Sequence, residues 1–314
     1  MNKVLVTCKL PGDYLAWLAE RCELTVYDGP NKSMSYNELL NTIEEYDALL
    51  CLVTNKIDKK IIDAGKRLKV ISNYAVGYNN IDIEYCTQKG IKVCNTPGVL
   101  TETTADCAFA LLLAAARRIV EADKFVRSKK FTGWEPDLFM GLDVYGKTLG
   151  IVGMGRIGQA VAKRASGFNM RVLYYDDLEL NDTSSIKVSF KQLLKDSDFI
   201  SLHVPYLKST HHLIDEKALN SMKNSAVLIN TARGPVVDEK ALALALKNGT
   251  IAGAGLDVFE KEPTVYDDLY SLSNVIMLPH IGSSSLATRH KMVEIAVKNL
   301  WQVVNNEQPL HAVN

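Results

Sequence analysis

The sequence predicts an α/β protein with two Rossmann-like, doubly wound parallel-sheet domains separated by an active-site cleft. Three observations indicate this fold: a length of 314 residues, the alternation of short apolar segments with helical ones, and a glycine motif between a strand and a helix. A chain of this length suits two domains better than one. Alternating strands and helices form βαβ units, because parallel strands need a crossover connection. Small ligands commonly bind between two such domains.

The first series of elements occupies residues 1–100. Apolar, β-branched segments predict strands at 3–7, 48–53, 70–73 and 91–94. Polar segments with helical spacing predict helices at 35–45 and 58–65. A long apolar helix at 101–120 then links this series to the next.

The second series begins near residue 148. It contains predicted strands at 148–152, 171–175, 198–204, 226–230, 253–257 and 275–278. Predicted helices lie at 157–166, 190–195, 216–221 and 239–247, and a final helix at 285–304 follows the last strand. If the final helix packs back on the first series, the first domain comprises residues 1–100 and 286–314. The second domain, which contains the glycine motif, is then 101–285.

The composition gives no indication of a polyanionic partner. Hydrophobic residues make up 47% and charged residues 23%, and Lys plus Arg equal Asp plus Glu at 36 each. This balance, without a basic run, predicts neither nucleic-acid nor membrane binding. The most apolar stretch, 107–120, is shorter than a membrane span and contains two arginines. We therefore expect a cytoplasmic protein.

The cysteines are expected to be free structural thiols. There are six, without CxxC spacing and without an export signal, which favours a reducing compartment. They are Cys8, Cys22, Cys51, Cys86, Cys94 and Cys107.

The glycine motif is a candidate dinucleotide site. Gly153, Gly155 and Gly158 form GxGxxG after the strand TLGIV and at the start of the helix RIGQAVAKRAS. The first glycine permits a tight turn, the second lets the backbone approach a pyrophosphate, and the third allows close helix–strand packing. The helix start at Arg156 and Ile157 offers N–H groups to phosphates. The alternative is a set of glycines that serves packing alone.

Asp176 predicts which dinucleotide is bound. It ends the second strand of this βαβ unit, 18 residues after Gly158. A carboxylate there accepts hydrogen bonds from the ribose 2′-OH and repels a 2′-phosphate. No arginine occurs in YYDDLEL. NAD(H) is therefore favoured over NADP.

Three later strands each lead into a loop with an ionisable residue. These residues are Arg233, Glu262 and His280. Ligands bind beyond the carboxyl ends of parallel strands, so the three side chains could converge. The alternatives are that Arg233 is a surface arginine, that Glu262 is a solvated loop charge, and that His280 is a surface or structural histidine, as most histidines are. Glu260, in the same loop as Glu262, is a second glutamate that could be mistaken for it.

Several segments resemble the signature segments of one family. NTARG, GLDVFEKEP, LPHIGSSS, VGYNNID, NTPGVLTETTAD and GKTLGIVGMGRIGQAVAKR are similar to those of the D-isomer-specific 2-hydroxyacid dehydrogenases, in the family's order and over nearly the whole chain. LLCLVTNKID and GWEPDLFMGLDVYGKTLG most resemble the glyoxylate/hydroxypyruvate reductase branch. The resemblance implies NAD(H)-dependent reduction of a small 2-oxo acid, such as glyoxylate or hydroxypyruvate.

The resemblance also implies roles for the three ionisable residues. His280 would protonate the carbonyl oxygen as the hydride arrives, Glu262 would keep His280 protonated, and Arg233 would hold the substrate carboxylate. Physical chemistry agrees with these roles. A positioned acid accelerates such a step by about 10²–10⁴-fold. A nearby carboxylate favours the imidazolium, and the planar guanidinium matches a carboxylate.

Further contacts follow from the same resemblance. Val76 and Gly77 would offer N–H groups to the substrate, Leu52 would face its tail, and Trp134 would reach the pocket of the other subunit in a homodimer. Thr104 would touch the cofactor phosphates, and Asp257 would lie near the nicotinamide or His280. The remaining implied cofactor residues are His203, Val204, Pro205, Thr210, Thr231 and Ala232.

Alternative functions within and outside the family remain open at this point. A D-3-phosphoglycerate dehydrogenase would resemble RSATK where this chain has Leu52 and its neighbours, and would carry an appended domain. A 2-ketogluconate-type dehydrogenase is a second alternative. A corepressor-like protein that senses NADH is a third, of another class. Many similar glyoxylate reductases have an arginine after the second Rossmann strand and use NADP, whereas this chain has Asp176 and Asp177.

Overall fold

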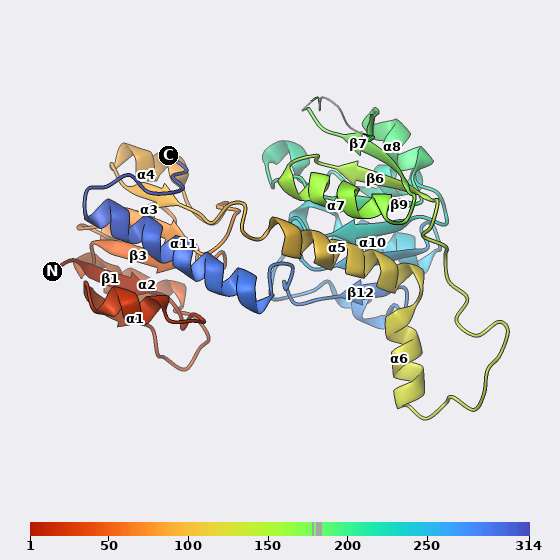
Figure 1. Cartoon of the computed structure of the whole chain (residues 1–314), viewed down its shortest axis with the longest axis horizontal. Coiled ribbons are helices and arrows are strands. Elements are labelled where there is room, and N and C mark those ends of the chain that lie inside the picture. Colours follow the sequence, from red (N-terminus) through yellow and green to blue (C-terminus); the bar gives the residue numbers. More distant parts are fainter. Residues whose placement is uncertain (178, 180–183) are drawn as a thin grey trace. The chain divides into compact units, whose positions relative to one another are not determined.

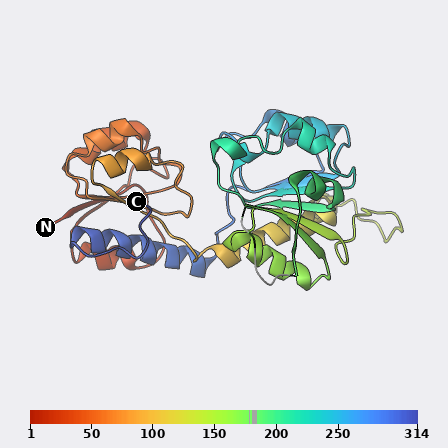
Figure 2. The ribbon, with the colours of Figure 1, turned by 90° about the horizontal axis from the view of Figure 1, so that it is seen from above.

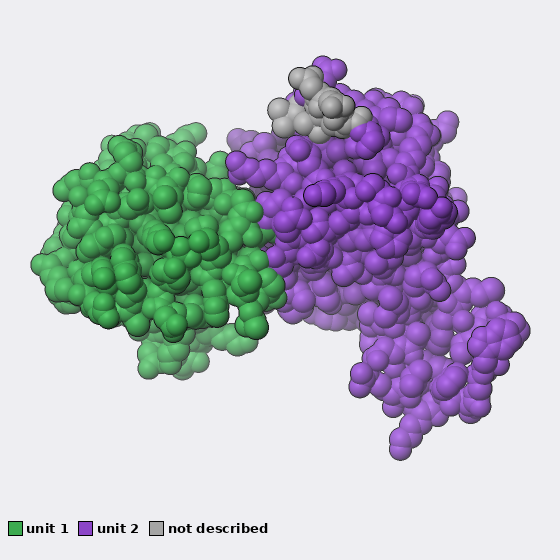
Figure 3. Space-filling view, in the orientation of Figure 1, with its two compact units in different colours: residues 1–100, 284–314 green, residues 101–283 purple. Residues whose placement is uncertain are grey.

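A computed structural model of the chain describes residues 1–177, 179 and 184–314. The chain divides into two compact units (Figure 3). Unit 1 comprises Met1–Leu100 and Ser284–Asn314, and unit 2 comprises Thr101–Ser283. Each unit has its own parallel sheet with helices on both faces (Figure 2), so the predicted α/β fold class is confirmed.

Unit 1 is built on a sheet in the order β2-β1-β3-β4-β5, with every described pair parallel. Its strands are β1 (Lys3–Val6), β2 (Glu23–Val26), β3 (Ala48–Cys51), β4 (Val70–Asn73) and β5 (Lys92–Cys94). Its helices are α1 (Tyr14–Ala19), α2 (Tyr36–Thr42), α3 (Lys59–Ala64), α4 (Ile83–Gln88) and α11 (Leu286–Val304), with a 3₁₀ turn at Ile43–Glu45. The sequence did not predict β2, because this edge strand exposes alternate residues and has no apolar run.

The C-terminal helix α11 belongs to unit 1 although it follows unit 2 in sequence. It packs along β3, β4 and β5 (Figure 1). Asn299 on this helix is fully buried. Its amide donates to the Asn95 carbonyl at 3.0 Å and accepts from the His311 N–H at 3.0 Å. The side chain of Asn299 thereby links the C-terminal segment at His311 to the loop after β5 through hydrogen bonds.

Unit 2 is built on a larger parallel sheet in the order β12-β11-β10-β9-β6-β7-β8. Its strands are β6 (Thr148–Val152), β7 (Arg171–Tyr175), β8 (Ile186–Lys187), β9 (Phe199–Leu202), β10 (Val227–Asn230), β11 (Gly253–Leu256) and β12 (Val275–Met277). Its helices are α5 (Thr101–Ala116), α6 (Ile119–Arg127), α7 (Arg156–Ser166), α8 (Phe190–Asp196), α9 (Glu216–Asn220) and α10 (Glu239–Lys247). The 3₁₀ turns are Lys208–Thr210, Gly234–Val236 and Asp267–Ser271.

The predicted linking helix at 101–120 is too long. Helix α5 ends at Ala116, and α6 starts in a new direction after Arg118, whose φ is 53°. The Ala116 carbonyl accepts a hydrogen bond from the Leu142 N–H at 2.7 Å. A returning segment of the chain therefore caps α5 where the sequence still favours a helix.

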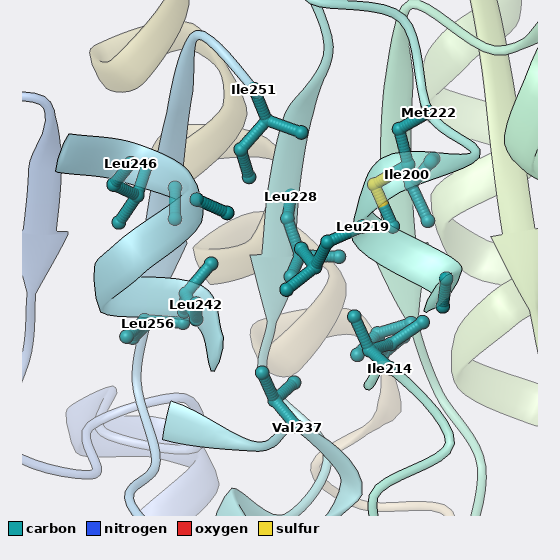
Figure 4. Packing of buried hydrophobic residues seen from close by; sticks show 14 of the residues in the cluster. Ile200, Ile214, Leu219, Met222, Leu228, Val237, Leu242, Leu246, Ile251 and Leu256 are labelled. Atoms are coloured by element: carbon teal, nitrogen blue, oxygen red, sulfur yellow. The ribbon is translucent and has the colours of Figure 1, made fainter. Parts of the chain in front are cut away.

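Apolar cores on the two faces of the unit 2 sheet hold its strands in place. On one face, Ile200, Leu228 and Leu256 belong to one apolar cluster with Leu219 of α9 and with Leu242 and Leu246 of α10 (Figure 4). On the other, side chains of α5 and α7 cover β6, β9 and β10. Strands buried on both faces have continuous apolar runs, which is why the sequence predicted these strands well.

The cysteines are free, as expected, and five of the six are buried. Burial raises the pKa of the Cys8 and Cys22 thiols to about 11, which keeps them protonated. Within the described residues, no helix is long and apolar enough to cross a membrane.

Candidate active site

The glycine loop of unit 2 leaves no room for side chains at two of its three glycines. Gly153 has a φ of +94°, and a Cβ there would lie 2.7 Å from the carbonyl carbon of His203. A Cβ on Gly158 would lie 2.2 Å from the Gly153 oxygen. At Gly155, which precedes α7, a Cβ would have no atom within 4 Å. The turn and packing roles predicted from sequence thus match the geometry, and the open position is the second glycine.

Asp176 lies directly beside this loop. It follows β7, and its Oδ2 accepts a hydrogen bond from the Met154 N–H at 2.5 Å. The carboxylate therefore orients the glycine loop. This contact was not predicted, because it joins residues that are 22 positions apart.

The loop after β9 contains His203, Val204, Pro205 and Thr210. His203 donates its backbone N–H to Val152 at 2.7 Å, and its Nε2 lies 2.8 Å from Ser201 Oγ. Burial lowers the pKa of His203 to about 3. This histidine is therefore neutral at physiological pH and cannot serve as the proton donor. Thr210 Oγ1 donates to the Pro205 carbonyl at 2.7 Å and fixes the turn.

Thr231 and Ala232 follow β10 and line the same edge of the sheet. The Ala232 N–H donates to Asn230 Oδ1 at 3.0 Å. Thr231 Oγ1 is buried and has no hydrogen-bond partner in the described part of the chain. Buried hydroxyls are rarely left without a partner, so this position fits a polar group of a ligand.

A histidine–glutamate pair lies at the same edge. His280 Nδ1 is 2.8 Å from Glu262 Oε2, as the sequence predicted. Glu262 Oε1 accepts the Phe259 N–H at 3.0 Å. Burial acts to raise the pKa of Glu262. This effect is outweighed by the hydrogen bond and charge of His280, by the Phe259 N–H and by the charge of Arg233, so the pKa lies below its usual value. The carboxylate is thus ionised at neutral pH and favours a protonated His280.

Hydrogen bonds fix Arg233 near enough to this pair for its charge to lower the pKa of Glu262. Its carbonyl accepts a hydrogen bond from Asn230 Nδ2 at 3.0 Å, and its Nη1 donates to the Ala232 carbonyl at 2.6 Å. A Cβ on the next residue, Gly234, would lie 1.9 Å from the backbone of Phe259. The loops after β10 and β11 are therefore in direct contact, and no other residue type fits at Gly234.

Asp257 fixes the turn that carries His280. Its buried carboxylate accepts the N–H groups of Ile281 and Gly282, both at 2.7 Å, and its carbonyl accepts the His280 N–H at 2.9 Å. His280 itself has a φ of 56°. Asp257 thus lies near His280, whereas its predicted position near the nicotinamide stays a prediction. A Cβ on Gly282 would lie 3.5 Å from Thr104 Cγ2, so the side chain of Thr104 lies close to this turn.

In unit 1, asparagines hold the loop that contains Leu52. Asn55 Oδ1 accepts the Leu52 N–H at 2.9 Å, and Asn80 Nδ2 donates to the Leu52 carbonyl at 3.1 Å. Asn55 Nδ2 also donates to the Met34 carbonyl at 3.1 Å. The backbone of Leu52 is therefore fixed from both sides.

Two further asparagines hold the turn after β4. Asn95 Nδ2 donates to the Val76 carbonyl at 2.8 Å, and Asn73 Nδ2 donates to the Gly77 carbonyl at 2.8 Å. The N–H groups of Val76 and Gly77 donate to no other residue that the structure describes. The sequence did not predict these roles for the asparagines, although all four occur at or after predicted strand ends. They are Asn55, Asn73, Asn80 and Asn95.

Trp134 lies in unit 2, in the segment after α6, and its side chain is 83% exposed. Phe131, Met140 and Tyr145 of the same segment are also exposed, at 55%, 69% and 68%. Large apolar side chains that gather in one exposed segment are typical of an interaction surface.

A Rossmann-type unit with this glycine loop, beside a histidine, a glutamate and an arginine, defines the class of nicotinamide-dependent oxidoreductases. The family model for the D-isomer specific 2-hydroxyacid dehydrogenase NAD-binding domain matches residues 109–282. The chain belongs to this family, as the sequence segments predicted. Unit 2 contains the matched NAD-binding region.

Relatives and solved structures agree with this assignment over the full length. The chain is 51% identical to a glyoxylate reductase of Thermococcus litoralis over 99% of this chain and 96% of the relative. It is 49% identical to a glyoxylate reductase of Pyrococcus horikoshii over the same shares. A crystal structure of a Thermus thermophilus protein matches with a TM-score of 0.95 and 46% identity, covering 99% of this chain and 100% of that one. An NADPH-dependent glyoxylate/hydroxypyruvate reductase of Sinorhizobium meliloti matches with a TM-score of 0.90 and 33% identity, covering 99% and 96%.

We expect substitutions at the second and third glycines to act differently. Gly155→Ala should leave the melting temperature unchanged, because the added Cβ meets no atom, but it should weaken NADH binding by about tenfold by obstructing the approach of the pyrophosphate. Gly158→Ala should lower both stability and binding, because its Cβ would collide with Gly153. Thermal unfolding and NADH fluorescence titration of both variants measure this difference. Equal effects on stability would contradict the assigned roles.

Proposed function

We propose that the chain is an NAD(H)-dependent reductase of small 2-oxo acids, with glyoxylate and hydroxypyruvate as substrates and D stereochemistry where the product is chiral. The single observation that carries this proposal is the 2.8 Å pair of His280 and Glu262, with Arg233 beside it, in the unit that contains the glycine loop. The names of the relatives support the choice of substrate.

His280, Glu262 and Arg233 have different roles in this reaction. A bound reduced nicotinamide would supply the hydride. Addition of a hydride to a carbonyl carbon leaves a carbonyl oxygen that needs one proton. His280 donates this proton from Nε2, because Nδ1 faces Glu262. Glu262 stabilises the imidazolium before the transfer. Arg233 binds the substrate carboxylate through its planar guanidinium and polarises the keto oxygen.

The proposed cofactor contacts follow from the geometry of unit 2. Backbone N–H groups at Gly155, Arg156 and Ile157 bind the pyrophosphate at the start of α7. Asp176, beside Met154, binds the ribose hydroxyls. The loop of His203, Val204, Pro205 and Thr210 borders the adenine. Thr104, Thr231, Ala232 and Asp257 contribute to the remaining part of the cofactor site, and the buried hydroxyl of Thr231 supplies a hydrogen bond.

We propose that residues of unit 1 also contact the substrate. The N–H groups of Val76 and Gly77 bind the substrate carboxylate, since asparagines fix their carbonyls and leave these donors available. Leu52 contacts the tail of the substrate. An apolar residue there favours a short, uncharged tail over the phosphate of a phosphoglycerate dehydrogenase substrate.

Turnover with a panel of 2-oxo acids tests the proposed activity. We expect oxidation of NADH with glyoxylate and hydroxypyruvate, and a rate that falls with rising pH because reduction needs protonated His280. His280→Asn should lower kcat by about 10²–10⁴-fold. Its NADH affinity should stay unchanged.

His290→Asn, at an exposed histidine of unit 1, is the matched control and should keep full activity. Binding of NADH without turnover of any 2-oxo acid would instead favour an NADH-sensing protein. Turnover of a phosphorylated or sugar-derived 2-oxo acid in preference to glyoxylate would favour the other dehydrogenase alternatives.

We propose that the enzyme uses NAD(H) in preference to NADP(H), because Asp176 repels a 2′-phosphate. Asp176→Ala should lower the ratio of kcat/KM for NADH to that for NADPH by about tenfold or more. Asp177→Ala is the control, since it removes an adjacent exposed carboxylate. An unchanged ratio in Asp176→Ala would show that another residue selects the cofactor.

The third prediction concerns assembly. We propose a homodimer in which the exposed segment around Trp134 packs on a second copy and reaches its substrate pocket. Trp134→Ala should favour the monomer in sedimentation experiments and raise KM for the 2-oxo acid. Tyr270→Ala, at a side chain that is 63% exposed elsewhere in unit 2, should do neither. A monomeric wild-type protein at micromolar concentration would contradict this proposal.

We also propose a cytoplasmic location, supported by the six free thiols. Fractionation of cells that express the chain, followed by detection of NADH-dependent glyoxylate reduction, checks this location.

A further inference from the structure

Glu239 is a buried carboxylate outside the cluster described above. It is the first residue of α10, and only 6% of its surface is exposed. Its Oε1 accepts the Glu260 N–H at 2.6 Å, and its Oε2 accepts the Tyr266 N–H at 3.2 Å. One side chain thus binds the loop 259–266 on both sides of Glu262.

The contact between α10 and this loop is reciprocal. Glu260 Oε1 accepts the Glu239 N–H at 3.0 Å and lies 3.1 Å from His212 Nε2. The family resemblance assigns Glu262, rather than Glu260, as the partner of His280. In the structure, Glu260 points toward α10 and His212, and Glu262 contacts His280.

This arrangement is electrostatically costly. Burial raises the pKa of Glu239, and the charges of Glu260 and Glu262 raise it further, against the lowering effect of the two N–H donors. Buried carboxylates are retained only where hydrogen bonds satisfy them. Glu239 is not needed to cap its own helix, because Asp238 does so through the Ala241 N–H at 3.0 Å. Its two hydrogen bonds serve the loop.

We propose that Glu239 is a positioning residue for the reaction: it fixes the loop 259–266 so that the Glu262 carboxylate meets His280 Nδ1. This inference rests on the proposed function, since it names a residue that acts through the Glu262–His280 pair. It predicts that Glu239 matters for activity only while Glu262 is present.

A double-mutant cycle tests this dependence. Glu239→Gln keeps the shape of the side chain but replaces one acceptor oxygen with an amide donor. It should lower kcat/KM by about 10- to 100-fold, as expected for a small displacement of a catalytic group. Glu262→Gln should lower it by about 10²–10⁴-fold. The double variant should be no slower than Glu262→Gln, within about twofold.

The pH profile gives a readout that a purely structural role would not move. In Glu239→Gln, the alkaline fall in reduction rate should occur at lower pH than in the wild type, and it should approach the profile of Glu262→Gln. Glu239→Asp, which keeps both acceptor oxygens, should restore part of the shift. Asp215→Asn is the control, because Asp215 also accepts a backbone N–H group, that of Ala218, but at the start of α9 rather than in the loop 259–266. It should leave the profile unchanged.

Additive losses in the double variant, or an unshifted profile in Glu239→Gln, would overturn the inference. If Glu239→Gln does not fold, as judged by circular dichroism and NADH binding, the cycle is run with Glu239→Asp. If the wild type turns over no 2-oxo acid, the proposed function fails. NMR titration of the His280 ring still tests the inference in that case: Glu239→Gln should shift its midpoint to lower pH, and no shift would overturn it.

Discussion

The parallel pairing of β10, β11 and β12 is the constraint on which the candidate site depends. Asn230 pairs with Leu256, and Leu256 pairs with Met277, so the three strands end at the same level. Their loops must therefore leave the sheet at one edge, and Arg233, Glu262 and His280 come together although 47 residues separate the first from the last. The backbone hydrogen bonds of these strands therefore determine where the three ionisable side chains lie.

Acidic side chains that accept backbone N–H groups refine this geometry. Asp257 holds the His280 turn, Asp176 holds the glycine loop, and Glu239 holds the loop of Glu262. A carboxylate that accepts backbone N–H groups fixes a loop more firmly than a neutral acceptor, because charge-assisted hydrogen bonds are stronger. Loops without regular structure can thus carry groups that need exact placement.

The loops of the two units are held by different kinds of side chain. In unit 2, carboxylates accept backbone N–H groups, whereas in unit 1 neutral asparagine amides donate to the backbone carbonyls of Val76 and Gly77. Amide side chains satisfy both carbonyl and N–H groups without adding charge. The turn after β4 is therefore fixed without a negative charge from the two asparagines that hold it.

The sequence by itself determined the fold class, the glycine loop, the acid after β7 and the family, because these depend on local periodicity and on short motifs. It also singled out His280, Glu262 and Arg233. Only the tertiary structure decided that Glu260 turns toward α10 and His212, that α5 ends at Ala116, and that β2 joins the sheet. Each of these outcomes depends on a contact between residues distant in sequence. The hydrogen bonds of Glu239 and of the unit 1 asparagines are of the same kind, and no local pattern encodes them.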